Sequence, residues 1–257
     1  MLDKSQIKQR FSKAVLTYDQ QAVVQKRICT ELAGLMDQYV GKKHWHQALE
    51  IGCGTGMFTQ EVLKHCAIDT LYLNDLSENI VTLQDATFLQ KTHTHLLMGD
   101  IEKQALPQNL DLVISSSALQ WMSDLPQLFS KIYEALKPQG YFVFSSFGRE
   151  NLREMKQLTG CGLDYFEIHL LQRFLMDCGF EFVMMKQEVQ QLYFEHPRDV
   201  LQHIKATGVT ATAQHRWTKS TLQQFYLDYA QFVSTPDSEV LQYPLTYHPI
   251  QCIVRKK

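Results

Sequence analysis

The sequence has no long hydrophobic run, few glycines and prolines, and almost no net charge. It contains 12 glycines and 7 prolines among 257 residues, and its formal net charge is -2. No apolar stretch approaches the ~18 residues that a membrane-spanning helix needs, so we expect no membrane span. The polar start Met1–Gln6 does not resemble a secretory signal. The near-neutral charge argues against a general attraction to nucleic acid or anionic lipid.

Cysteine is scarce and scattered. The six cysteines include no C-x-x-C pair and stand at Cys29, Cys53, Cys66, Cys161, Cys178 and Cys252. This spacing is not typical of a zinc site or a disulfide framework. We therefore expect reduced thiols, a cytoplasmic protein and no bound metal. His44 and His46 form an H-x-H pair, but the sequence offers no third ligand beside them, so we interpret them as surface residues.

What the sequence does have is an alternation of short apolar strands and amphipathic helices. Strands are expected at 47–51, 70–74, 95–98, 110–115, 141–146, 182–194 and 245–255. Helices are expected at 5–16, 20–40, 57–65, 76–90, 125–136, 168–178, 198–206 and 219–232. Ser77 is the expected N-cap of the fourth of these helices, and Lys137–Gly140 is expected to be a turn.

This alternation predicts an α/β fold with a mostly parallel sheet of seven strands. The composition, 45% hydrophobic, suits a single domain over residues 1–257. Residues 1–40 are expected to form an N-terminal helical lid, and 196–240 a small helical insertion. The last strand follows that insertion without a crossover helix, so we expect it to be antiparallel.

A glycine turn follows the first expected strand. Glu50-Ile51-Gly52-Cys53-Gly54-Thr55-Gly56 reads E-x-G-x-G-x-G. Glycine lets the backbone approach a bound nucleotide closely. A dinucleotide-binding turn would read G-x-G-x-x-G, but here Met57 stands at the position of its third glycine. The run instead resembles motif I of the class I S-adenosylmethionine-dependent methyltransferases, which have a Rossmann-like fold.

Polar residues follow the next strands in the order that such a site requires, because ligands lie at the carboxyl ends of the strands in open α/β sheets. Asp75 would bind the two ribose hydroxyls, Asp100 would accept from the adenine amino group, and Ile101 would flank the ring. Ser115 would lie near the sulfonium. The expected residues for binding S-adenosylmethionine are therefore Glu50, Gly52, Cys53, Gly54, Gly56, Asp75, Leu76, Asp100, Ile101 and Ser115.

Through short matching stretches along its whole length, the chain resembles one family, the malonyl-acyl carrier protein O-methyltransferases of biotin synthesis. They include Arg10-Phe11, Tyr18-Asp19, Gln25, Leu49–Gly56, Asp75-Leu76-Ser77, Gly99-Asp100, Asp111–Ser115, Ala118–Trp121, Leu136-Lys137-Pro138, Phe144–Gly148, Leu152–Met155, Gly179-Phe180 and Leu245-Thr246-Tyr247. Two residues depart from the family pattern. Ser116 stands where asparagine is common, and Gln139 where glycine is usual, in a turn that we expect to tolerate it.

The resemblance implies methylation of the free carboxylate of malonyl-acyl carrier protein. A carboxylate is already ionised at neutral pH, so the catalytic residues should position the reactants rather than move protons. Tyr18 would donate to the carboxylate from the lid, and Gln120 would donate an amide hydrogen bond. Trp121 would form a wall of the site, and Arg149 would pair with the carboxylate.

Acyl carrier protein is acidic, so the resemblance also implies a local basic patch on a monomeric enzyme. Three groups are candidates: Lys4, Lys8 and Arg10; Arg149, Arg153 and Lys156; and Arg216 and Lys219. The alternatives are a methyltransferase acting on a small free acid of the trans-aconitate kind, a non-catalytic S-adenosylmethionine-binding protein, and, least supported, a nicotinamide oxidoreductase.

Overall fold

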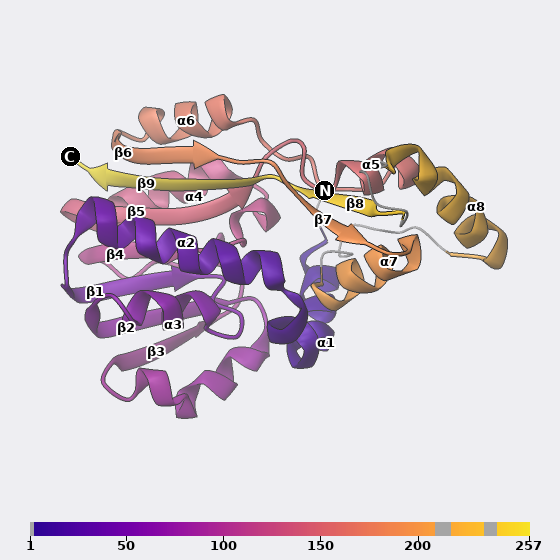
Figure 1. Ribbon diagram of the computed structural model, residues 1–257. Coiled ribbons are helices and arrows are strands. Elements are labelled where there is room, and N and C mark those ends of the chain that lie inside the picture. The colour runs from indigo at the N-terminus through magenta and orange to yellow at the C-terminus, as the bar shows by residue number, and fades with distance from the viewer. Residues whose placement is uncertain (1–2, 209–216, 234–240) are drawn as a thin grey trace.

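The main sheet has seven strands in the order β3-β2-β1-β4-β5-β9-β6 (Figure 1). The computed structural model describes residues 3–208, 217–233 and 241–257, without the side chains of 13–19. The strands are β1 (His44–Ile51), β2 (Ala67–Asp75), β3 (His93–Met98), β4 (Leu110–Ser115), β5 (Leu136–Phe147), β6 (Phe180–Gln187) and β9 (Pro249–Lys256). β9 pairs antiparallel with β5 and β6, whereas the other neighbours pair parallel. The expected mostly parallel sheet with an antiparallel last strand is confirmed.

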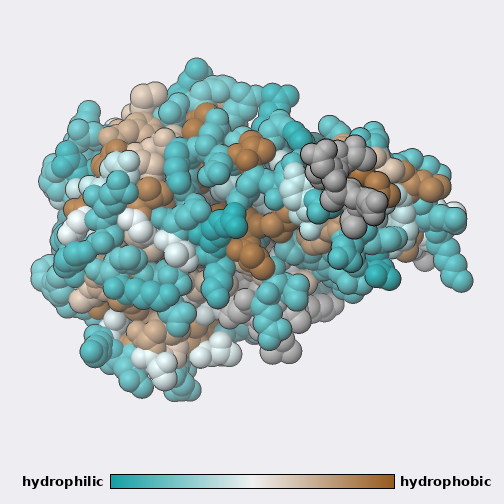
Figure 2. Space-filling model, in the orientation of Figure 1, coloured by the Kyte–Doolittle hydropathy of each residue, from teal (hydrophilic) through white to brown (hydrophobic). Residues whose placement is uncertain are grey.

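A smaller lobe lies beyond the carboxyl ends of the parallel strands, on the right of Figure 1. Its elements are the paired strands β7 (Gln190–Phe194) and β8 (Tyr243–Tyr247), with α5 (Arg153–Thr159), α7 (Pro197–Ala206), α8 (Lys219–Tyr229) and the short helix η5 (Ala230–Phe232). Helix α1 (Lys4–Gln21) lies beneath this lobe. Figure 2 shows a mostly hydrophilic face, with hydrophobic residues gathered where the sheet meets the lobe.

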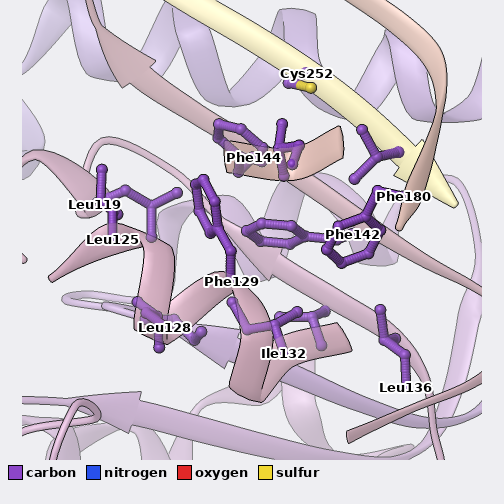
Figure 3. Packing of buried hydrophobic residues seen from close by; sticks show 14 of the residues in the cluster. Leu119, Leu125, Leu128, Phe129, Ile132, Leu136, Phe142, Phe144, Phe180 and Cys252 are labelled. Carbon is purple, nitrogen blue, oxygen red and sulfur yellow. The ribbon is translucent and has the colours of Figure 1, made fainter. Parts of the chain in front are cut away.

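Helices cover both faces of the main sheet. α2 (Val23–Val40) and α3 (Met57–Leu63) cover one face, and α4 (Leu125–Ala135) and α6 (Ile168–Asp177) cover the other. Successive strand residues point to opposite faces: Phe142 and Phe144 pack toward α4, and Val143 packs toward α2. Figure 3 shows Phe142 and Phe144 beside Phe129 of α4. Among the described residues, no helix combines the length and the hydrophobicity that crossing a bilayer requires.

Two expected strands each divide in the structure, and the small sheet was not predicted. The run 182–194 becomes β6 and β7, and the run 245–255 becomes β8 and β9. The chain passes from one sheet to the other at Glu188 and again at His248. There the Glu188 N–H donates to the Pro249 carbonyl at 3.1 Å, and the His248 N–H donates to Asn151 Oδ1 at 3.2 Å. The weak alternation over 182–194 and the hydrophobic residues on both sides of His248 favoured single strands, although the polar run 186–188 and Pro249 mark the crossings.

The helix expected at 76–90 is wrong in type. Ser77 is the N-cap as expected and accepts from the Asn79 N–H, but the segment forms two 3₁₀ helices, η1 (Glu78–Asp85) and η2 (Thr87–Leu89). Its buried residues Ile80, Leu83 and Leu89 are separated by multiples of three. Side chains three residues apart eclipse one another in a 3₁₀ helix. This spacing therefore places the three buried side chains along one narrow edge of the segment.

The segment Lys137–Gly140 belongs to β5 instead of forming a separate turn. Leu136 already pairs with Leu110, and the register then shifts before Tyr141 pairs with Leu112. The extra residues are accommodated by a left-handed backbone at Gln139, whose φ is 63°. Glycine adopts this conformation more readily than glutamine, so the departure from the family pattern at Gln139 introduces backbone strain.

Candidate active site

An outer cavity lies at the carboxyl ends of β1, β2 and β4. The glycine turn forms its floor, with Gly52, Gly54 and Gly56 at φ values of 70°, 53° and 78°. A Cβ at Gly52 would lie 2.3 Å from the Ala118 Cβ, whereas one at Gly54 would meet nothing within 4 Å. Gly52 therefore lets the β4–α4 loop approach the turn, and Gly54 leaves open space. These are the features of a cradle for a ligand with a bulky nucleoside group.

The side chains of the expected cofactor site gather at this cavity. Residues that line it include Glu50, Gly52, Cys53, Gly54, Asp75, Leu76, Asp100 and Ile101. Asp75 Oδ2 accepts from the Gly54 N–H at 2.9 Å, and its Oδ1 accepts from the Ser77 N–H at 2.7 Å. These bonds fix the carboxylate at the mouth of the glycine turn, although burial raises the pKa of Asp75.

Two residues expected at the cofactor lie behind the cavity wall. The Ser115 hydroxyl is fully buried and donates to the Ile51 carbonyl at 2.9 Å, so it ties β4 to β1. Gly56 is the N-cap of α3, and a Cβ there would lie 2.8 Å from Phe88. Both positions shape the site from outside the cavity lining.

Glu50 is buried and receives a hydrogen bond from the Thr59 hydroxyl. Burial raises its pKa to about 8, with the Thr59 hydrogen bond opposing the shift. At neutral pH the folded protein therefore holds Glu50 largely protonated. Burial also raises the pKa of the Cys29 thiol, to about 12, and that of Cys53. Both cysteines line the outer cavity as neutral thiols.

Glu50→Gln is expected to flatten the pH dependence of stability. Between about pH 4.5 and pH 8 the folded protein holds a proton on Glu50 that the unfolded chain has lost. The free energy of unfolding therefore falls with rising pH in this interval, by up to about 1.4 kcal/mol per pH unit. Glutamine does not titrate, so the variant lacks this pH-dependent loss of stability. Urea unfolding should therefore give it a higher free energy of unfolding than wild type near pH 8, and the difference should disappear near pH 4. Glu134→Gln, at an exposed position of α4, is the control, and wild-type and E50Q curves that stay parallel would contradict the expectation.

Helix α1 covers the outer cavity. Ile7, Lys8 and Phe11 line it together with Lys4. Lys4 Nζ donates to Asp100 Oδ1 at 2.5 Å and also bonds Glu102. Although burial raises the pKa of Glu102, hydrogen bonds from Lys4 and from two backbone N–H groups lower it overall. The helix is thus fastened to the strand end that was expected to bind adenine.

An inner cavity adjoins the outer one beneath the small lobe. Both cavities share Phe11, Gln25, Ser117 and Trp121. The rest of the inner lining is Gln120, Phe147, Asn151, Tyr165, Thr207 and Tyr247. The rings of Phe11 and Trp121 meet edge to face at 5.5 Å. The structure thus brings Gln120 and Trp121 together at the junction of two cavities.

The other two residues expected to act on substrate have different positions. Arg149 is 73% exposed, pairs with Glu167 at 2.7 Å, and lines neither cavity. Tyr18 is in α1, but its side chain lies outside the described residues. Gln25, to which the sequence assigned no role, is a polar residue on the buried face of α2 beside Val24 and Ile28. That interruption of an apolar stripe was the available signal.

The H-x-H pair does have a third neighbour. Asp69 Oδ1 lies 2.7 Å from His44 Nε2, and Asp69 Oδ2 lies 2.9 Å from His46 Nδ1. The expectation that no third ligand exists is therefore wrong, because strand pairing supplied one from β2. The three side chains are exposed near the amino ends of β1 and β2, at the opposite end of the sheet from both cavities, and their mutual hydrogen bonds account for the arrangement.

Comparison with known proteins agrees with this geometry. Residues 49–144 match the family described as "Methyltransferase domain". The chain is 43% identical over 258 residues to a malonyl-[acyl-carrier protein] O-methyltransferase of Acinetobacter baylyi, covering 99% of this chain and 98% of the relative. A protein of the same name from Haemophilus influenzae is 35% identical, with coverage of 99% and 95%. The chain belongs to the malonyl-[acyl-carrier protein] O-methyltransferase family.

Solved structures show the same fold at low sequence identity. The YcgJ protein of Bacillus subtilis aligns with a TM-score of 0.64 at 13% identity, covering 88% of this chain and 98% of that one. The [4+2]-cyclase SpnF aligns at 0.54 and 17% identity, with coverage of 88% and 80%. Because one of these structures is a cyclase, the fold by itself does not determine the reaction. The family assignment rests on the full-length relatives.

Proposed function

We propose that this protein transfers the methyl group of S-adenosylmethionine to the free carboxylate of malonyl-acyl carrier protein. The observation that supports this most directly is the junction of the two cavities at Phe11, Gln25, Ser117 and Trp121. The outer cavity has a glycine cradle and fixed carboxylates that suit the cofactor. The inner cavity is small and is lined by aromatic rings and uncharged polar side chains, which suits the end of a short acyl chain.

The outer cavity fits S-adenosylmethionine on three counts. Gly52 and Gly54 hold backbone conformations that leave room beside the turn. Asp75 would accept from the ribose hydroxyls, and Asp100 would accept from the adenine amino group beside Ile101. The Gln25 Oε1 atom is buried without a hydrogen-bond partner among the described residues and faces this region. The amino-acid end of the cofactor offers the N–H donors that such an acceptor needs.

The reaction requires the protein to position the two reactants and to exclude water. S-adenosylmethionine supplies an activated methyl group on a sulfonium. A carboxylate has a pKa near 4 and is ionised at neutral pH, so no side chain needs to remove a proton. Trp121 and Phe11 close the junction, and α1 closes the outer cavity as a lid. Alignment of two bound reactants can contribute roughly 7–11 kcal/mol to the lowering of a reaction barrier.

The carrier protein is proposed to dock on the helical insertion. Acidic partners already hold two of the three candidate basic groups. Lys4 and Lys8 bond Asp100, Glu102 and Glu78, while Arg149, Arg153 and Lys156 bond Glu167, Glu150, Glu154 and Asp164. In the third group, Arg216 lies outside the described residues.

Lys219 is exposed on α8, and Lys205 is exposed at the end of α7, two residues before Thr207 of the inner cavity. Within the described ranges neither lysine has an acidic partner. An acidic carrier that docks here would deliver its acyl chain beside the inner cavity.

The double variant Lys205→Glu/Lys219→Glu is expected to raise KM for malonyl-acyl carrier protein about tenfold or more, because charge reversal repels an acidic partner. The effect should weaken as salt is added, since ions screen exposed charges. Activity on malonyl-coenzyme A, which has no carrier surface, should change less than twofold.

Lys91→Glu, an exposed charge reversal beside β3 at the far edge of the sheet, serves as the control. A normal KM in the double variant, or an equal loss in the control, would place the dock elsewhere.

The function itself is tested by methyl transfer from labelled S-adenosylmethionine. Malonyl-acyl carrier protein should be methylated, and succinyl-acyl carrier protein and trans-aconitate should react far more slowly. Cofactor binding without transfer to the malonyl carrier would reject the proposal, and turnover of trans-aconitate would then indicate a small-acid methyltransferase.

All six cysteines are free thiols, which agrees with a cytoplasmic enzyme, and we propose that it acts as a monomer.

A further inference from the structure

The inner cavity contains an unusual concentration of unsatisfied polar atoms. In the part of the chain that the structure describes, five buried side-chain nitrogen or oxygen atoms have no hydrogen-bond partner. Four of them belong to lining residues of the inner cavity: Gln25 Oε1, Ser117 Oγ, Gln120 Oε1 and Trp121 Nε1. An unpaired buried polar atom costs free energy, so their gathering in one place indicates a bound polar group.

We propose that the inner cavity holds the malonyl carboxylate on two neutral donors, the Trp121 indole N–H and the Ser117 hydroxyl. This inference rests on the proposed function and names the side chains that recognise its substrate. An indole nitrogen can only donate a hydrogen bond, and a hydroxyl can donate one, whereas an ionised carboxylate only accepts. The two unpaired donors at the cavity junction therefore match the two oxygens of one carboxylate.

On the inner-cavity side, the described surroundings of these donors have no charged side chain. No lysine, arginine, histidine, aspartate or glutamate of the described ranges lines the inner cavity. The His203 ring bonds the Tyr247 hydroxyl at 2.8 Å, and its carbonyl accepts from Thr207. Burial lowers the pKa of this histidine, which favours its neutral form. Neutral donors orient a carboxylate without the charge neutralisation of an ion pair, so the nucleophile keeps its negative charge toward a cationic sulfonium.

Backbone strain at Ser117 supports a role for its hydroxyl. Ser117 has a φ of 54°, a left-handed conformation that few residues other than glycine adopt. Its N–H donates to Ser145 Oγ at 3.0 Å, which holds this conformation in place. Strained residues concentrate at functional sites, where surrounding structure maintains them. Ser117 lines both cavities, and its hydroxyl has no hydrogen-bond partner among the described residues.

Gln120 has a role in addition to the one that the sequence suggested. Its Nε2 donates to the Ser117 carbonyl at 2.6 Å, so the atom that faces the cavity unpaired is the acceptor Oε1. This bond holds the Ser117 backbone in place, and the second N–H of the same amide remains available as a donor. An acceptor beside the carboxylate also disfavours any second anionic group in the cavity.

Two further polar side chains of the inner cavity, Asn151 and Tyr165, bond each other. Asn151 Nδ2 donates to the Tyr165 hydroxyl at 2.8 Å, and Asn151 Oδ1 accepts from the His248 N–H. Burial raises the pKa of Tyr165 to about 12, so its hydroxyl stays protonated. Their mutual hydrogen bond holds Asn151 and Tyr165 in place, and the Tyr165 hydroxyl, which accepts in this bond, keeps its own proton to donate. We expect malonyl to be preferred over succinyl, because the extra methylene of succinyl moves its carboxylate farther from the thioester and so out of register with the Trp121 and Ser117 donors.

Two single variants remove the donors with little change in shape. Trp121→Phe keeps an aromatic wall but loses the N–H, and Ser117→Ala keeps Cβ but loses the hydroxyl. Each is expected to lower kcat/KM for malonyl-acyl carrier protein at least tenfold, while Kd for S-adenosylmethionine, measured by calorimetry, stays within twofold of wild type. The preference for malonyl over succinyl carrier should also shrink in both variants.

Trp45→Phe is the matched control, because Trp45 Nε1 is likewise buried without a partner but lies in the core under α2, outside both cavities. This variant should keep the kcat/KM of wild type. If Trp121→Phe and Ser117→Ala also keep it, the donor assignment is overturned while the proposed function stands. If the wild type itself fails to methylate malonyl-acyl carrier protein, the proposed function fails first. Should Trp121→Phe lose stability, Ser117→Ala, which removes one oxygen, decides the question.

Discussion

Asp75→Asn should weaken S-adenosylmethionine binding by about 10- to 150-fold. The Asp75 carboxylate accepts from the Gly54 and Ser77 N–H groups and has further acceptor positions toward the outer cavity. An amide of the same shape has only one acceptor atom, so it must give up either a backbone bond or the ribose contact. Hydrogen bonds to charged groups contribute about 1.5–3 kcal/mol each, which gives this range for the loss of one bond. Titration calorimetry measures Kd directly.

The control for Asp75→Asn is Asp69→Asn, on the same strand but exposed near its opposite end. It should bind the cofactor like wild type. Because Asp75 also holds the glycine turn, thermal unfolding without ligand must accompany the titration. A folded Asp75→Asn variant with an unchanged Kd would show that the outer cavity binds its ligand by other groups.

Gly52→Ala should be far more damaging than Gly54→Ala, although both glycines have left-handed backbones. At Gly54 a Cβ meets open space, so only the conformational penalty of about 1–2 kcal/mol applies. At Gly52 the same penalty is joined by a 2.3 Å contact with the Ala118 Cβ. We expect Gly52→Ala to lower the free energy of unfolding by more than about 3 kcal/mol and to abolish methyl transfer, because Ala118 adjoins the Ser117–Trp121 loop. Urea unfolding and a transfer assay measure the two effects.

The double variant Gly52→Ala/Ala118→Gly isolates the contact. Removing the Ala118 Cβ leaves the new methyl group 3.8 Å from the Ala118 Cα, an ordinary distance. The double variant should therefore recover most of the stability difference between Gly52→Ala and Gly54→Ala. If the double variant instead loses as much stability as Gly52→Ala and Ala118→Gly lose together, the contact between the two residues is not the cause of the loss.

The cofactor side of the site could be predicted because each of its residues lies at or just after the end of a strand. In an open α/β sheet, positions that follow successive strands meet at one edge, so the spacing of Gly52, Asp75 and Asp100 along the chain is enough to indicate a common cavity. The same reasoning fails at Ser115, which also ends a strand. The direction of its hydroxyl, toward the Ile51 carbonyl, depends on tertiary packing that sequence spacing does not reveal.

The inner cavity could not be predicted because it is assembled from distant segments. Gln25, Asn151, Tyr165 and Tyr247 come from four separate parts of the chain. They meet because the chain leaves the main sheet at Glu188 and returns at His248, forming a second small sheet. Hydrophobic periodicity does not distinguish one long strand from two strands joined at such a crossing. Arg149 shows that a place near a strand end is not sufficient. The sequence predicts that it pairs with the substrate carboxylate, but in the structure its side chain is exposed and pairs with Glu167.

The central claim is that one carboxylate of a carrier-bound malonyl group receives the methyl group. The most direct test incubates the purified protein with S-adenosylmethionine and malonyl-acyl carrier protein and determines the intact mass and fragmentation of the product. The account predicts one added methyl group per carrier, located as an ester on the distal carboxylate and removed by mild base. A methyl group on the carrier polypeptide, or an unmodified malonyl group after cofactor binding has been shown, would contradict it.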